Sequence, residues 1–180
     1  MQKQKKSSIG SMLLTAIVIL AILLYVIFSL NLKDPLWFIP TYNATASEII
    51  IHCYGEDVQV EPGSAAFVSL NDAVNKGISG TKRWDSLSLS TVTYEDYMSN
   101  PKMMVLDFRY DKPQMIHSAY RFFKKFDQLL IPLVGRHANY NSVFGRLGEY
   151  PEAGSFHLRD NAPILQLVEE LQLCKNQNSQ

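Results

Sequence analysis

One long apolar segment near the amino terminus dominates the pattern of hydrophobic and polar positions. The stretch from Ser7 to Leu32 carries no charged residue, and its centre is almost wholly apolar. A helix of about 20 apolar residues crosses the roughly 30 Å hydrocarbon core of a bilayer. Because lipid offers no partners to backbone N–H and C=O groups, such a segment must be helical. Residues 7–32 are therefore predicted to be a transmembrane helix that contacts the lipid bilayer.

A cleaved signal peptide is the alternative for this segment. Signal peptides also begin with a basic region, but their apolar region usually holds only about 7 to 15 residues and ends in a small-x-small site. The run here is longer, and Phe28-Ser29-Leu30 does not match such a site. The sequence therefore favours a retained signal-anchor and a single-pass membrane protein.

The charges that flank the apolar segment predict its orientation. Lys3, Lys5 and Lys6 precede it, whereas Lys33 on the other side is offset by Asp34. Lysine and arginine near a span favour the cytoplasmic side. We therefore expect a basic cytoplasmic leader over residues 1–6 in the cell membrane and an extracytoplasmic location for everything after the span.

The rest of the chain divides into a linker, one domain and a tail. Two prolines, Pro35 and Pro40, stiffen the predicted linker over 33–46. The domain is predicted over 47–174, and the polar residues 175–180 are expected to be a disordered tail. After Tyr42 the chain holds 16 acidic and 13 basic residues. This balance argues against a nucleic-acid partner, because phosphate binding needs a basic surface.

Alternating apolar positions and turn residues predict several strands and few helices in the domain. Pro132 places its strand at a sheet edge or a bulge, because proline cannot donate to a ladder. Short turns between strands indicate antiparallel pairing. The sequence therefore predicts an α+β fold, with a mainly antiparallel sheet of about five to seven strands covered by two or three helices. Strands are expected at 48–54, 58–60, 103–110, 115–123, 128–134, 142–147 and 155–158, and helices at 65–74, 90–98 and from about 161 onward.

Two cysteines, Cys53 and Cys174, both fall in the predicted extracytoplasmic domain. Cys53 alternates in phase with Ile49 and Ile51, and Cys174 lies three residues after Leu171, so both thiols are expected to face one core. An oxidising compartment permits a disulfide between them. The presence of two cysteines does not by itself imply a disulfide, and the sequence favours the interpretation that both are buried free thiols.

The polar loop after the strand 128–134 is the best candidate for a binding site. Arg136, His137, Asn139 and Tyr140 combine a cation, an imidazole, an amide and a phenol. Loops on a rigid scaffold commonly carry binding residues, and arginine can hold an anion through two hydrogen bonds. A plain solvated hairpin loop is the simpler alternative.

Catalytic, metal and cofactor sites have no sequence support. His52, His117, His137 and His157 lack the spacings that place metal ligands on one helical face. No nucleophile elbow or phosphate-binding loop occurs, so no catalytic residue and no cofactor is assigned. Asn43-Ala44-Thr45 matches the N-glycosylation sequon, which matters only in a host that glycosylates exported proteins.

The sequence therefore favours a membrane-anchored binding or scaffolding domain. Its expected partner is a membrane or envelope protein, or a second copy of the chain. The alternative is a membrane-tethered enzyme with a site around residues 135–141 and His117 or His137 as proton carrier.

Overall fold

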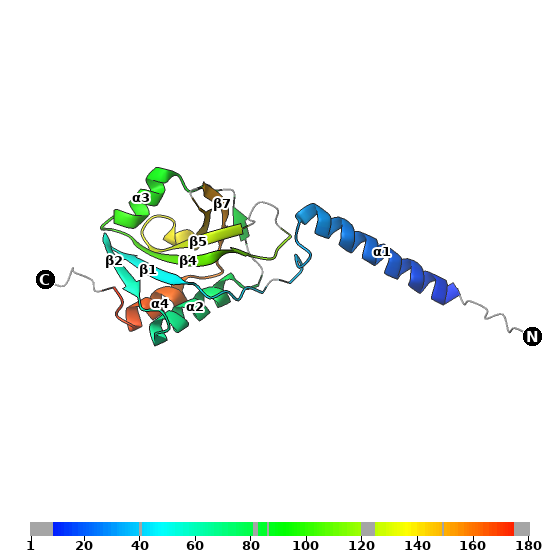
Figure 1. Ribbon diagram of the computed structural model, residues 1–180, viewed down its shortest axis with the longest axis horizontal. Helices are drawn as coiled ribbons and strands as arrows, with labels where there is room; N and C mark the ends of the chain where they lie inside the picture. Colours follow the sequence, from blue (N-terminus) through cyan, green and yellow to red (C-terminus); the bar gives the residue numbers. More distant parts are fainter. Residues whose placement is uncertain are drawn as a thin grey trace, which may run out of the picture.

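In the computed structural model, a long helix leads into a domain that is built on a β-sheet with helices against it (Figure 1). The structure describes residues 9–39, 41–80, 83–85, 87–119, 125–148 and 150–174. The predicted leader 1–6 and tail 175–180 lie outside these ranges.

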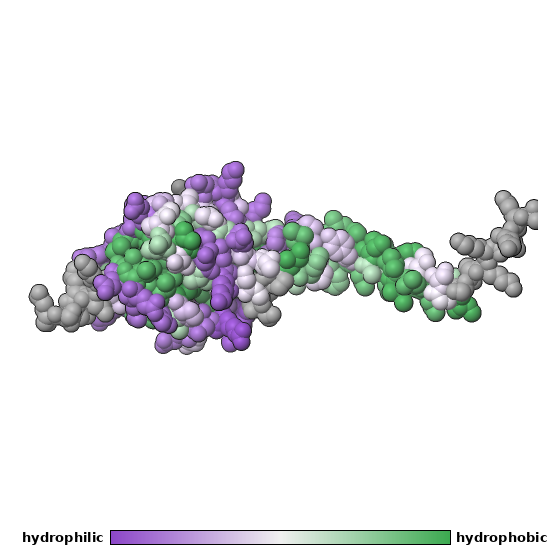
Figure 2. All heavy atoms as spheres, turned by 90° about the horizontal axis from the view of Figure 1, so that it is seen from below, coloured by the Kyte–Doolittle hydropathy of each residue, from purple (hydrophilic) through white to green (hydrophobic). Residues whose placement is uncertain are grey.

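Helix α1 (Ile9–Leu32) confirms the predicted apolar helix and is long and apolar enough to cross a membrane. None of its residues is buried in the protein. Figure 2 shows it green along much of its length, whereas the face of the domain seen in this view is largely purple, with a green area at the end away from α1. Lys33, the first residue after the helix, has a left-handed backbone (φ 54°), and the Asp34 N–H donates to the Ser29 carbonyl at 3.2 Å.

A seven-stranded antiparallel sheet forms the centre of the domain, which confirms the predicted α+β fold. The order of strands across the sheet is β2-β1-β4-β5-β6-β7-β3. The strands are β1 (Glu48–Cys53), β2 (Glu56–Val60), β3 (Arg83–Asp85), β4 (Met104–Met115), β5 (Lys125–Val134), β6 (Ser142–Leu147) and β7 (Tyr150–His157). The other helices are α2 (Ala65–Ile78), α3 (Thr91–Ser99) and α4 (Ala162–Glu170), with a short 3-10 turn η1 (Ala138–Tyr140).

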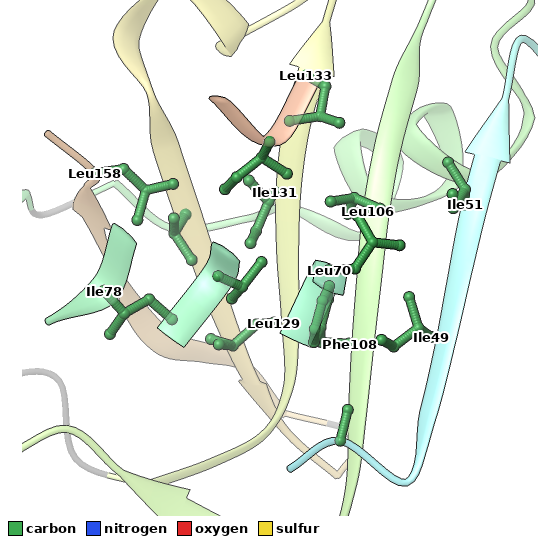
Figure 3. Close-up of a cluster of buried hydrophobic side chains, with 14 of the residues drawn as sticks. Ile49, Ile51, Leu70, Ile78, Leu106, Phe108, Leu129, Ile131, Leu133 and Leu158 are labelled. Carbon is green, nitrogen blue, oxygen red and sulfur yellow. The ribbon is translucent and has the colours of Figure 1, made fainter. Parts of the chain in front are cut away.

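The main core lies between the sheet and the helices α2 and α4, which cover the same face (Figure 1). Because side chains alternate along a strand, every second residue of the central strands points into this layer. Figure 3 shows Ile49 and Ile51 of β1, Leu106 and Phe108 of β4, and Leu129 of β5 among these side chains. All five are fully buried.

The opposite face carries a smaller core under helix α3. Ser90, where the sequence predicts this helix to start, is its N-terminal cap, and the Ser90 side chain accepts a hydrogen bond from the Thr93 N–H. Tyr97 of α3 packs against Phe144 of β6, with ring centroids 5.9 Å apart. Beside this small apolar cluster the same face of the sheet becomes polar.

The middle strands differ from the prediction at their ends. The predicted turn at residues 111–113 is wrong, because β4 continues through it to Met115. An interrupted register between Arg109 and Gln114 accommodates Pro113 there. The predicted strand 115–123 is wrong over 116–119, which is irregular, and its end lies outside the described residues.

Strand β5 also corrects one of two expectations for Pro132. It is a central strand between β4 and β6, so the predicted edge position is wrong. The alternative, a bulge, is confirmed, because the register with β4 skips one residue beside Pro132. The carbonyl oxygen of Pro132 accepts a hydrogen bond from the side-chain amide of Asn161 at 3.3 Å.

Two asparagines of α2 fasten the segment before β1 to the domain. Asn71 Oδ1 accepts from the Ala46 N–H at 3.0 Å, and Asn75 Oδ1 accepts from the Ala44 N–H at 3.2 Å. Both amide groups also donate to the Ala44 carbonyl. Residues 44–46 of the segment expected to be a linker are therefore hydrogen-bonded to the helical layer.

Cys53 and Cys174 are joined in a disulfide. The favoured interpretation of two free thiols is therefore corrected in favour of the alternative. The shared phase of Cys53 with Ile49 and Ile51 is confirmed, since all three are buried on the face of the sheet that α4 covers. The bridge links β1 to the segment after α4 across 121 residues of sequence.

Candidate functional site

A row of polar side chains crosses four strands on the sheet face that α3 partly covers. The register places Glu48 of β1 opposite Arg109 of β4, Arg109 opposite Gln128 of β5, and Gln128 opposite Arg146 of β6. Residues directly opposite in an antiparallel pair have side chains on the same face, close enough to interact. We call this row, together with His52, Asp57 and Asp107, the sheet-face network.

Asp107 is the buried centre of the sheet-face network. Its side chain is wholly inaccessible to solvent. Arg109 donates to its Oδ2 from Nε at 3.0 Å and lies within 2.9 Å through Nη2, and Gln128 Nε2 donates to its Oδ1 at 2.8 Å. A buried carboxylate remains charged only where such donors replace water. Arg109 continues to Glu48 at 3.1 Å, which links Asp107 to the surface.

The Arg146 end of the network contacts helix α3. The Arg146 guanidinium lies over the Tyr94 ring, 3.6 Å from its centroid, within the range of a cation–π interaction. Its Nη1 also donates to Gln128 Oε1 at 3.4 Å. These contacts couple α3 to the polar row.

His52 lies between two carboxylates of the same network. Its Nδ1 is 2.6 Å from Asp57 Oδ1, and its Nε2 is 3.6 Å from Asp107 Oδ2. Burial by itself would lower the pKa of His52, but the carboxylates of Asp107 and Asp57 outweigh it and raise that pKa. A protonated His52 is the third cation, with Arg109 and Arg146, against the three carboxylates of the network.

The stability of the domain is therefore expected to fall as the pH rises through the folded-state pKa of His52. The folded pKa lies above the ordinary value of 6.5, so the stabilisation is fully present below the ordinary value and disappears as the pH rises from there through the folded-state pKa. Denaturant unfolding from about pH 5.5 to about pH 9 measures this dependence. His52→Gln should flatten the dependence, and Asp57→Asn should reduce it. Identical pH profiles for the native protein and His52→Gln would contradict the assignment.

The loop with the predicted binding residues turns sharply at both ends. Gly135 adopts φ 92°, and a Cβ there would lie 2.8 Å from the Met103 side chain and 3.1 Å from a backbone oxygen, so only glycine fits. His137 and Asn141 flank η1 with φ 66° and 52°, a left-handed conformation that is rare for non-glycine residues. Strained positions of this kind cluster at functional sites.

The structure separates the four predicted binding residues, and only two of them share a pocket. His137 turns inward, where its Nδ1 lies 2.5 Å from the Tyr97 hydroxyl and its ring packs on Phe144. Burial, followed by the charge of Arg136, lowers the pKa of His137, so the ring is neutral and its Nδ1 accepts a hydrogen bond from the Tyr97 hydroxyl. Arg136 is exposed. Asn139 and Tyr140 instead line a separate surface pocket.

That pocket has a volume of about 370 Å³ and lies where β3 and β7 meet the loop. We call it the β3–β7 pocket. It is lined by Arg83, Asn139, Tyr140, Asn141, His157, Leu158 and Arg159. Arg83 and Arg159 are both exposed residues, and neither has an ion-pair partner among the residues that the structure describes. The pocket is therefore cationic.

The four histidines do not come together. His52 pairs with Asp57, His117 with Asp34 and His157 with Asp85, while His137 pairs with Tyr97. Within the described ranges, no group of three or more metal-binding side chains converges. Each of the four imidazoles therefore has its own hydrogen-bond partner, and the four lie at separate places in the fold.

His117 belongs to the joint between α1 and the domain. Asp34, which is only 5% exposed, follows α1 directly. Its carboxylate lies 2.8 Å from His117 Nδ1 and accepts from the N–H groups of Leu36 and Ser118 at 2.9 and 3.3 Å. The end of the apolar helix is thus tied to the segment that follows β4, 83 residues away in sequence.

Sequence reasoning did not find the sheet-face network or the arginines of the pocket. Arg159 follows directly after the predicted strand 155–158, and this position at the end of a strand could have marked it as a candidate loop residue. Arg83 lies in β3, a strand of three residues that is too short to show alternation. The network depends on register, which periodicity within one segment does not reveal.

Comparison with protein-family models, with curated protein sequences and with solved structures gives no match to this chain.

Proposed function

We propose that this chain is a single-pass membrane protein whose extracytoplasmic domain binds a ligand or an envelope partner at the β3–β7 pocket. The observation that carries this proposal is that two exposed arginines, without an ion-pair partner among the described residues, line one hollow together with Asn139 and Tyr140. Tyr140 is 69% exposed, which leaves its ring available for contact. Loops held by a rigid sheet are a common place for binding sites.

Two further observations support the membrane arrangement. The basic leader of Lys3, Lys5 and Lys6 favours a cytoplasmic amino terminus. The disulfide between Cys53 and Cys174 is typical of an oxidising compartment outside the cytoplasm. The hydrogen bonds of Asp34 with His117 and Ser118 then hold the domain in a defined orientation relative to α1, which suits a scaffolding or receptor role.

A membrane-tethered enzyme is the second candidate, favoured by the left-handed backbone and the neutral ring of His137. A neutral imidazole is the form that acts as a general base. His137→Gln separates the two functions, because it would abolish turnover by an enzyme and leave binding at the β3–β7 pocket largely unchanged.

The proposed function predicts two results in intact cells. A membrane-impermeant thiol reagent should label Glu61→Cys, an exposed domain position, and should not label Gln4→Cys in the leader. A photocross-linking amino acid at Tyr140 should give a discrete adduct that the same probe at Val68, 51% exposed on α2, does not give. Labelling at Gln4→Cys alone would overturn the orientation, and identical adducts at both probe positions would overturn the binding site.

A further inference from the structure

The ligand class of the β3–β7 pocket follows from the groups that line it, if the pocket is the binding site proposed above. We propose that it binds an anionic sugar, meaning one sugar unit that carries a carboxylate or a phosphate. Arg83 and Arg159 hold the anionic group, and Tyr140 and Asn139 contact the ring and its hydroxyls.

The backbone brings the two arginines to one place. Arg83 of β3 pairs directly with His157 of β7. Arg159 follows His157 by two residues. The Leu158 N–H donates to the Asn141 carbonyl at 2.8 Å, which fastens the end of β7 to the loop. The pocket is therefore built by hydrogen-bonded backbone rather than by a chance approach of side chains.

The acidic residues that the structure describes next to the two arginines in sequence, Asp85 and Asp160, each have a hydrogen-bond partner. Asp85, two residues from Arg83 on the same strand, lies 3.0 Å from His157 Nε2. Asp160, next to Arg159, accepts from the Ala162 N–H at 3.0 Å at the start of α4. The other ring nitrogen of His157 lies 2.5 Å from the Tyr140 carbonyl. The guanidinium groups of Arg83 and Arg159 thus remain the open charges of the pocket among the described residues.

A guanidinium group matches the geometry of carboxylate and phosphate oxygens through two parallel N–H donors. Exposed ion pairs contribute little in water, so the arginines alone would hold an anion weakly. Additional affinity has to come from Tyr140, whose exposed ring offers an apolar face, and from Asn139, whose side-chain amide has no hydrogen-bond partner among the described residues. An aromatic face and a free amide suit the C–H face and the hydroxyl groups of a sugar.

The size of the pocket sets the size of the ligand. At about 370 Å³ it lies near the lower end of the volumes of about 300 to 1,000 Å³ that small-molecule sites have. One sugar unit is therefore the appropriate scale, and the remainder of a longer glycan would extend into solvent.

Calorimetric titration of the full-length protein in nanodiscs of phosphatidylcholine tests this inference. D-glucuronate and glucose 6-phosphate are the anionic probes, with D-glucose and inorganic phosphate as the neutral and sugar-free probes. Both anionic sugars should bind more tightly than either comparison compound. Arg83→Gln and Arg159→Gln should each raise Kd about fivefold, as expected for loss of one exposed charge contact. Lys112→Gln removes an equal charge from an exposed position of β4 and should leave Kd unchanged.

Equal binding of glucose and glucuronate would overturn the role of the arginines, and equal binding of inorganic phosphate would overturn the role of the sugar ring. A Kd that rises as much in Lys112→Gln as in the arginine variants would also overturn the site. If these titrations fail while the cross-link at Tyr140 forms, the ligand class is wrong and the proposed function stands.

Discussion

Replacing Asp107 with alanine is expected to lower the free energy of unfolding by about 2–3 kcal/mol, because the buried carboxylate is the acceptor of one neutral and one charged donor and Arg109, left behind, is partly exposed. The variant leaves Arg109 and His52 facing a site that no longer holds a negative charge. Gln128 also loses the acceptor of its 2.8 Å hydrogen bond. Urea unfolding of the full-length protein in detergent micelles measures the difference.

Asp111 offers a matched control for this prediction. It lies on the same strand and is exposed, so Asp111→Ala should change the stability by less than about 0.5 kcal/mol. The double variant Asp107→Ala/Arg109→Ala should lose clearly less stability than the sum of the losses of the two single variants. Each single variant leaves the other partner without its counter-charge, and the double variant does not. A loss for Asp107→Ala no larger than that for Asp111→Ala would show that the network does not stabilise the fold.

Loss of the disulfide is expected to have a similarly large effect. Replacing Cys53 or Cys174 with serine should lower the free energy of unfolding by about 2–5 kcal/mol. The bridge closes a loop of 121 residues, and long loops lose the most chain entropy when the unfolded state is cross-linked. Thermal unfolding of the variants with and without a reducing agent measures the effect.

The two single variants provide their own control. Each removes the same bond, so Cys53→Ser, Cys174→Ser and the double variant should lose nearly equal stability, and a reducing agent should bring the native protein close to them. A greater loss of stability in Cys53→Ser than in Cys174→Ser would show that packing around the Cys53 side chain contributes as well as the bond. Cys53 is only 8% exposed, and Cys174 is less buried.

Much of the fold could be predicted because its signals are local. The apolar run of α1, the alternation of Ile49, Ile51 and Cys53, and the cap at Ser90 each depend on a few consecutive residues. Hydrophobic periodicity reports which face of a strand is buried. The antiparallel α+β class followed from the short turns between such strands.

The errors came from positions where tertiary contacts override local signals. The residues 111–113 look like a turn, but β4 continues through them because its register with β5 relaxes there. Pro132 looks like an edge residue, but a bulge on one side and the Asn161 side chain on the other accommodate it inside the sheet. Of the predicted loop, Tyr140 and Asn139 line the β3–β7 pocket, whereas His137 is used to pack against α3.

The sequence by itself determined that an apolar helix precedes an α+β domain, and which faces of its strands are buried. Only the tertiary structure decided that Glu48, Arg109, Gln128 and Arg146 form one row, that Cys53 meets Cys174, and that Arg83 joins Arg159 in one pocket. The physical reason is that periodicity arises from the geometry of one segment. Register and strand order arise from pairing between segments that are far apart in the chain.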